Sequence, residues 1–195
     1  PEIDIWYTII CLGVFAGLYT AAGGLKAVVY TDVLQAIILL SGSTVLTYLM
    51  FSEFDFSWSA FVNTVPADQL SMIRPIDDEA LPWLGTLIGV PVLGFYYWAT
   101  NQYIVQRVLG AKNIKNARWG AMLGGSLKVG ALFIMVLPGL MAISVFPGLD
   151  DPDMVFPTMV ANMLPIGLTG LVLAGLISAI LSSIDSTLNS SSTLI

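Results

Sequence analysis

The chain has 195 residues, of which 56% are hydrophobic and 10% charged, and it carries a net charge of −6 without any histidine. This composition excludes an ordinary water-soluble domain, and the acidic balance argues against a nucleic-acid partner. Without histidine the chain cannot use histidine-based acid–base chemistry, Ser-His-Asp triads or most transition-metal sites, so we do not expect an enzyme.

Five apolar runs approach or exceed the roughly 20 residues that cross a bilayer as a helix. We therefore expect an all-α integral membrane protein, organised as a single transmembrane domain, with spans at 5–21, 27–51, 81–105, 119–146 and 164–187. The chain starts at Pro1 and stops inside a polar helix at Ile195, which we interpret as an interior fragment of a longer protein.

Charged residues are divided between the two ends of these spans. Lys26 follows the first span, and the segment 106–118 after the third span contains four basic residues, beginning with Arg107. Most acidic residues lie in the other loops, including 52–80. Because an excess of basic residues marks cytoplasmic loops, we expect 106–118 to be cytoplasmic and 52–80 to be extracellular.

The second span carries Asp32 and Gln35 one helical turn apart in its cytoplasmic half. One interpretation is structural, since the helix dipole favours an acid near the start of a helix. The other interpretation places Asp32 on an inner exit route for a cation. The residues alone leave both open.

The third span is interrupted by Gly85, Gly89, Pro91 and Gly94. This pattern predicts a helix that is bent or broken near the middle of the membrane. Broken helices often form transporter binding sites, because their free carbonyl groups can coordinate a substrate. The alternative is a kinked helix that only packs against its neighbours.

Three aromatic residues, Tyr96, Tyr97 and Trp98, follow this interruption. Such side chains can stack on a sugar ring or close a pathway. They are equally typical of the aromatic belt at a membrane surface, so a gate and a belt are both compatible with the sequence.

Lys128 lies deep in the fourth span. An ammonium group at that depth must snorkel to the surface, pair with an acid or donate hydrogen bonds to a ligand. We favour a ligand or ion-pair role, because the three donors of lysine suit sugar hydroxyl groups and equally a carboxylate.

The fifth span carries several hydroxyl groups and the carboxyl group of Asp185. In lipid, such groups are costly unless they face a bundle interior, a water cavity or an ion. At about 100° per residue, one side of this helix carries Gly175, Ala179, Ser182, Ser183 and Ser186. Oxygen atoms gathered on one face suit a hard cation such as sodium.

Four segments together resemble a known family: GGLKAVVYTDVLQ (23–35), YYWATNQYIVQRVLGAKN (96–113), LKVGALFIMVLPG (127–139) and LPIGLTGLVLAGLISAILSSIDSTLNSSSTL (164–194). In this order they resemble the sodium/solute symporter family, specifically its sodium/glucose cotransporter branch and the bacterial galactose-transporting relatives. The resemblance implies a LeuT-type core of two inverted five-helix repeats, of which this chain would hold helices four to eight. The protein would be a multi-pass component of a plasma membrane or a bacterial inner membrane.

The same resemblance implies a sodium site on the fifth span. Ala179 would offer its backbone carbonyl oxygen, and Ser182 and Ser183 their hydroxyl groups, to sodium as the coupling ion. The remaining ligands would come from a helix that precedes Pro1.

A second set of residues would serve an inner cation path. By resemblance, Asp32 matches an aspartate on the route by which sodium leaves the family's transporters. Asp185 and Ser186 fall where some members build a second sodium site.

The resemblance places the substrate site on the third and fourth spans. Tyr97 matches the tyrosine that closes the sugar site from the cytoplasm, with Tyr96 and Trp98 beside it, and Lys128 matches the lysine that binds sugar hydroxyls. Gly94 replaces an asparagine that binds substrate in the bacterial galactose transporter. This departure leaves the identity of the sugar open.

We therefore expect sodium-coupled symport of a sugar or related polyol by alternating access. The expected partners are a small-molecule substrate, the lipid bilayer and the remaining helices of the full transporter. Two alternatives remain: symport of an amino acid, sialic acid or monocarboxylate, and a membrane sensor that keeps the transporter bundle.

Overall fold

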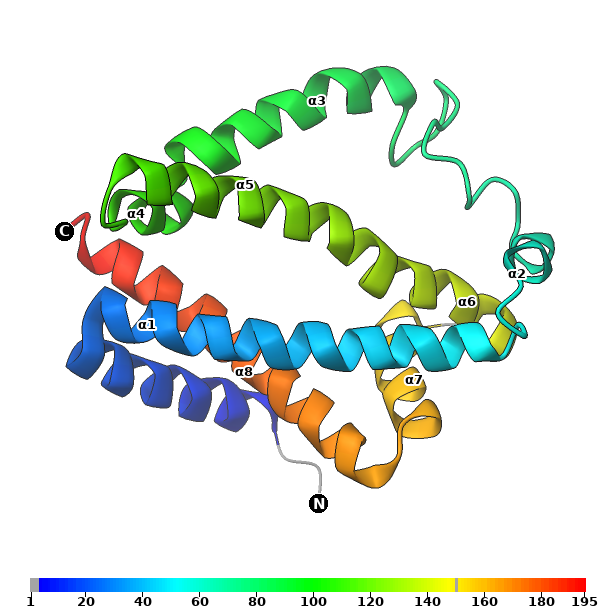
Figure 1. The fold of residues 1–195 in the computed structure, drawn as a ribbon, viewed down its shortest axis with the longest axis horizontal. Coiled ribbons are helices and arrows are strands. Elements are labelled where there is room, and N and C mark those ends of the chain that lie inside the picture. Colours follow the sequence, from blue (N-terminus) through cyan, green and yellow to red (C-terminus); the bar gives the residue numbers. More distant parts are fainter. Residues whose placement is uncertain (1–3, 150) are drawn as a thin grey trace.

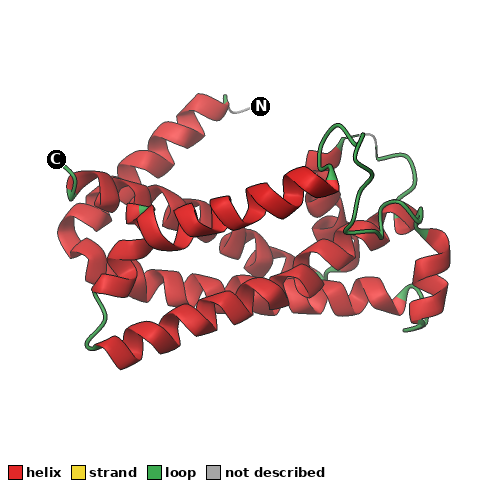
Figure 2. Cartoon of the chain, turned by 90° about the horizontal axis from the view of Figure 1, so that it is seen from above, coloured by secondary structure: helices red, strands yellow, loops and turns green. Residues whose placement is uncertain are grey.

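The computed structural model describes residues 4–149 and 151–195, which form a bundle of helices joined by loops, the longest of them at 65–82 (Figures 1 and 2). The α-helices are α1 (Ile5–Ser52), α2 (Trp58–Thr64), α3 (Trp83–Phe95), α4 (Gln102–Leu109), α5 (Ile114–Ala131), α6 (Leu137–Val145), α7 (Val155–Met163) and α8 (Ile166–Ser192). In the described ranges, three helical stretches are long and apolar enough to cross a membrane: Ile5–Ser52, Ile114–Val145 and Ile166–Ser192. The expected all-α membrane architecture is confirmed.

Helix α1 consists of two arms that meet at Gly24. This residue has φ 58° and ψ −164°, a conformation that is readily adopted by glycine alone. The chain therefore reverses its direction at the left of the bundle, and the dark blue arm runs back beneath the light blue one (Figure 1). The bend falls between the first two expected spans, although the division of the chain into five spans stays a prediction.

The helix of the third expected span is interrupted at a different place from the one predicted. Helix α3 continues through Pro91, and a π-helical segment, Tyr96–Thr100, extends it to Asn101. Asn101 is extended and its side-chain oxygen accepts a hydrogen bond from the Tyr103 backbone N–H at 3.1 Å, which starts α4. Proline removes only one helical hydrogen bond, whereas an asparagine cap supplies a new helix start, so the break lies at Asn101.

Helices α5 and α6 are joined by a second π-helical segment, Leu132–Val136. Pro138, at the start of α6, has no N–H to donate to the carbonyl oxygen of Ile134, one turn earlier. The Thr47 hydroxyl group on α1 donates to that carbonyl at 2.9 Å. A contact between two long helices thus satisfies the acceptor that proline leaves free.

The most extensive contact between two helices joins α1 and α8. Two glycines allow these helices to approach closely. A Cβ atom added to Gly42 would lie 2.5 Å from Val172 Cγ2, and one added to Gly175 would lie 3.0 Å from Ile38 Cγ2. Small residues allow membrane helices to approach in this way. The approach brings the polar residues of α8 against the second arm of α1.

Replacing Gly42 with alanine is expected to destabilise the protein by about 1–3 kcal/mol, because the added methyl group overlaps the Val172 side chain. Thermal unfolding would measure the loss. A second change, Val172→Ala, removes the overlapping atom and should restore part of the stability. Simple addition of the two losses in the double variant would contradict this explanation.

The loop between α2 and α3 is held by Asp78. Its carboxylate accepts hydrogen bonds from the backbone N–H groups of Leu81 at 2.8 Å and Ala80 at 3.1 Å, and from Arg74 Nε at 2.9 Å. The bond from Leu81 is the largest of the effects that lower the pKa of Asp78 below its usual value. At a pH above the usual pKa of an aspartate, the ionised carboxylate therefore stabilises the loop. This stabilisation is lost as the pH falls through the lowered pKa of Asp78.

We accordingly expect the amide hydrogens of Ala80 and Leu81 to exchange faster as the pH is lowered from about 4 through the lowered pKa of Asp78, after correction for intrinsic rates. Hydrogen exchange measured by mass spectrometry would detect this change. Asp78→Asn should abolish the extra pH dependence, whereas the neighbouring Asp77→Asn should retain it. Equal behaviour of the two variants would contradict the assignment to Asp78.

Candidate functional site

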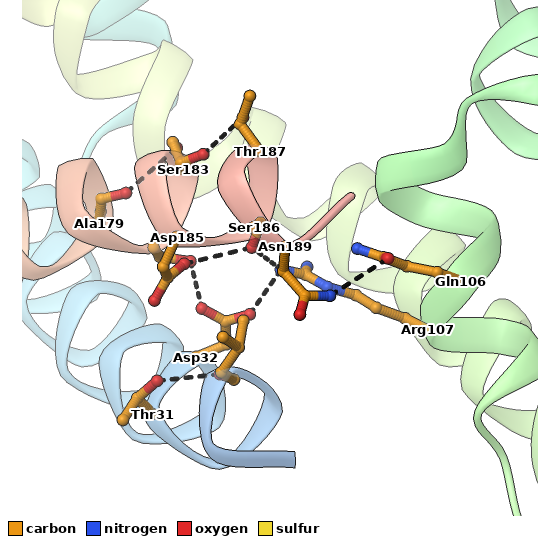
Figure 3. Close-up of polar contacts among 12 residues, drawn as sticks. Thr31, Asp32, Gln106, Arg107, Ala179, Ser183, Asp185, Ser186, Thr187 and Asn189 are labelled. Carbon is orange, nitrogen blue, oxygen red and sulfur yellow. Dashed lines mark hydrogen bonds and ion pairs between the residues drawn. The ribbon is translucent and has the colours of Figure 1, made fainter. Parts of the chain in front are cut away.

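Polar side chains from α1, α4 and α8 meet near one end of the bundle (Figure 3). We call this group the inner polar cluster; it consists of Tyr19, Asp32, Arg107, Ser182, Asp185 and Ser186. Asp185 and Ser186 are fully buried, with 0% of their surface exposed. Buried polar groups are costly unless they are paired, so their partners indicate what the cluster can do.

The carboxylate of Asp32 has partners on two other helices. One oxygen accepts from Arg107 Nη2 at 2.6 Å, and the other accepts from the Ser182 hydroxyl group. Arg107 Nη2 also donates to the Ser186 hydroxyl oxygen. This arrangement connects α1, α4 and α8 through a single guanidinium group, while the place of Asp32 on a cation path stays a prediction.

Asp185 has a different environment, made of hydroxyl groups. Its carboxylate accepts from the phenol group of Tyr19 and from the Ser186 hydroxyl group, the latter at 3.4 Å. The salt bridges found in the described ranges include none to Asp185. The cluster therefore holds two carboxyl groups and one guanidinium group, so with both carboxyl groups ionised it would carry a net negative charge.

A second layer of contacts joins α4 to the C-terminal end of α8. The Asn189 amide group donates to Gln106 Oε1 at 3.3 Å, and both residues are buried. The Gln102 amide group donates to the Thr193 hydroxyl group, also at 3.3 Å. These bonds fix the position of α4 and thus of Arg107.

The expected oxygen stripe of α8 is divided between two faces. Ser183 is exposed, and its hydroxyl group donates to the Ala179 carbonyl oxygen at 3.2 Å. Ala179, Ser183 and Thr187 lie on the side of the helix away from Asp32 (Figure 3). Because consecutive helical residues diverge by about 100°, Ser182 points to Asp32 while Ser183 does not. The two serines thus have different hydrogen-bond partners, and the sodium-ligand roles of Ala179, Ser182 and Ser183 stay a prediction.

Three of the expected substrate residues line one cleft. The Nζ atom of Lys128 lies 3.8 Å from the centroid of the Tyr97 ring, and the rings of Tyr97 and Trp98 meet edge to face at 5.4 Å. A cleft of about 530 Å³ between α1, α4, α5 and the π-helical segment contains all three residues in its wall. We call it the Lys128 cleft.

Tyr96 and Gly94 do not join this group. Tyr96 is 55% exposed and is not part of the cleft wall. A Cβ atom added at Gly94 would meet no atom within 4 Å, so this glycine lies in open space on α3. The structure supports neither residue as part of the Lys128 cleft.

The sequence-based prediction of site residues did not include two members of the inner polar cluster. Arg107 was interpreted only as a cytoplasmic loop charge, and Tyr19 was not considered. A signal for Tyr19 exists, because a phenol within an apolar span needs a hydrogen-bond partner when it is buried. No comparable signal exists for Arg107, whose partners lie 75 and 79 residues away in the chain.

Comparisons with known proteins agree with the resemblance seen in the sequence. The model of the sodium:solute symporter family matches residues 2–195. The chain is 36% identical to sodium/glucose cotransporter 4 of Mus musculus, with 98% of the chain and 33% of that protein covered. It is 34% identical to sodium/myo-inositol cotransporter 2 of Homo sapiens (99% and 34% covered) and 33% identical to sodium/glucose cotransporter 1 of Ovis aries (98% and 35% covered). The chain thus spans about a third of the length of these curated relatives.

Proposed function

The chain belongs to the sodium:solute symporter family, and from this premise we propose that it forms part of a sodium-coupled symporter for a sugar or a related polyol. Proteins of this family are multi-pass membrane proteins and transporters rather than enzymes. The proposed activity is alternating access, in which the inward flow of sodium drives the uptake of the substrate.

One observation carries the proposal most directly, namely the contact of Lys128 with Tyr97 and Trp98 in one cleft. An aromatic wall suits the apolar face of a sugar ring, and an ammonium group supplies donors for its hydroxyl groups. Relatives named for glucose and myo-inositol also favour a neutral, polyhydroxylated substrate over a carboxylate.

Sodium is proposed as the coupling ion. The Ala179 carbonyl oxygen and the Ser183 and Ser182 hydroxyl groups would hold it, and their oxygen chemistry suits an alkali cation. Asp32, Asp185 and Ser186 would form a second site or the inner exit. A bound sodium ion supplies a positive charge that these oxygens stabilise, so its occupancy can shift the balance between outward-open and inward-open states.

Transport by the whole transporter of which this chain forms part would test the proposal. Counterflow of radiolabelled glucose, galactose and myo-inositol into proteoliposomes is expected to occur in sodium and to fall strongly in potassium. Equal uptake in both salts would contradict sodium coupling. Failure of all three polyols, with uptake of an amino acid, sialic acid or monocarboxylate, would instead favour a substrate that pairs with Lys128 through its carboxylate. No uptake of any solute would favour a sensor.

A further inference from the structure

Arg107 differs from the other basic residues of the segment 106–118. Lys112, Lys115 and Arg118 are exposed, whereas the Arg107 side chain is only 28% exposed and enters the inner polar cluster (Figure 3). Its guanidinium group lies 5.0 Å from the centroid of the Tyr103 ring on the same helix. Arg107 lies on α4, which Asn101 caps, and its side chain contacts Asp32 on α1 and Ser186 on α8.

The guanidinium group is held by one nitrogen atom. Nη2 donates both to Asp32 and to Ser186. Nε is buried and has no hydrogen-bond partner among the described residues. Arginine binds a carboxylate most strongly through two parallel bonds, and an unpaired buried donor is costly. The interaction between Arg107 and Asp32 is therefore weaker than a two-bond arginine–carboxylate pair would be.

The oxygens around this nitrogen are the same ones that suit an alkali cation. Asp32 provides a carboxylate, Ser182 and Ser186 provide hydroxyl groups, and Asp185 lies beside Ser186. Guanidinium and sodium cannot both occupy one set of oxygens at full contact. Occupancy by one cation must weaken the binding of the other.

Arg107 also lies between two cavities. It contributes to the wall of the Lys128 cleft and to that of a second cavity of about 560 Å³, which is lined by Lys26, Tyr30 and Gly110 toward the inner end. Movement of this one side chain would change the walls of both. Arg107 thus contacts the oxygens of the inner polar cluster and also forms part of the wall of the Lys128 cleft.

We propose that Arg107 is an internal competitor of the transported cation: its guanidinium group occupies the oxygens of Asp32 and Ser186 when the ion is absent and leaves them when the ion binds. The release of the side chain then alters the wall between the Lys128 cleft and the inner cavity. This inference rests on the proposed sodium coupling. It assigns to Arg107 the control of sodium binding at the inner polar cluster.

Removal of the competitor should strengthen sodium binding. Stabilisation of the purified whole transporter against heat is measured as sodium replaces choline at constant ionic strength. Arg107→Gln is expected to lower the half-saturating sodium concentration about tenfold. Arg107→Lys, which keeps the charge, should remain closer to the unaltered protein, and Arg118→Gln serves as the matched control that should change nothing. An unchanged or raised half-saturating concentration in Arg107→Gln would overturn the proposal.

A second measurement needs no variant and applies even if Arg107→Gln fails to fold. The arginine reagent phenylglyoxal is applied with and without sodium, and its adducts are located by mass spectrometry. Modification of Arg107, relative to the exposed Arg118, should rise several-fold in sodium. A constant or falling ratio would overturn the proposal. If the unaltered protein shows no sodium-dependent stabilisation at all, the failure lies with sodium coupling itself rather than with Arg107.

Discussion

Replacement of Lys128 by alanine is expected to raise the substrate concentration for half-maximal transport about tenfold or more, because a charged donor in contact with the substrate is lost. The loss includes the cation–π contact with Tyr97, at 3.8 Å, which holds the ammonium group in the cleft. Sodium-driven uptake by the whole transporter in proteoliposomes, measured over a range of sugar concentrations, would give the value.

Two further variants separate the explanations of Lys128. Lys128→Gln keeps hydrogen-bond donors without the charge, so it should retain part of the affinity for a sugar and lose most of the affinity for a carboxylate substrate. Lys115→Ala, at an exposed position in the first turn of α5, serves as the control and should behave like the unaltered protein. If Lys128→Ala leaves the substrate affinity unchanged, the ammonium group merely covers the aromatic rings.

The secondary structure could be predicted where the signal is local. Apolar runs of bilayer length predicted helices at 5–21, 27–51, 119–146 and 164–187, and the structure contains long helical stretches at Ile5–Ser52, Ile114–Val145 and Ile166–Ser192. The interruption of the third expected span was misplaced because proline and glycine lower the stability of a helix without ending it. The asparagine at 101 ends the helix because its side chain competes for backbone N–H groups.

The site could be predicted only in part, for a geometric reason. Lys128 was recognised as unusual at its depth, Tyr97 and Trp98 were recognised from their position and the family resemblance, and the structure brings the three together in one cleft. Arg107 resembles an ordinary cytoplasmic charge in the sequence, and its role depends on where α4 sits against α1 and α8. Single-sequence patterns describe the faces of one helix, whereas the inner polar cluster depends on the packing of three.

The division of α8 into two faces leads to a second prediction with a large effect. Ser183→Ala is expected to raise the sodium concentration for half-maximal transport about tenfold, since the proposed hydroxyl ligand beside the Ala179 carbonyl oxygen is removed. Ser183→Thr retains the hydroxyl group and should restore most of the sodium dependence. Ser178→Ala, for which we expect only a packing role, is the control.

Comparison with Ser182→Ala then distinguishes the two faces. Ser182 donates to Asp32, so its loss should also disturb the Arg107 pair and make the sodium response depend on residue 107, whereas the loss of Ser183 should not. Combining each serine variant with Arg107→Gln gives the two coupling energies. Strong coupling at Ser182 and weak coupling at Ser183 would mean that Ser182 acts with the inner polar cluster, whereas Ser183 binds sodium at a separate site. Equal coupling at both would mean that the two faces of α8 bind a single ion, and an unchanged sodium dependence in Ser183→Ala would remove that residue from the site.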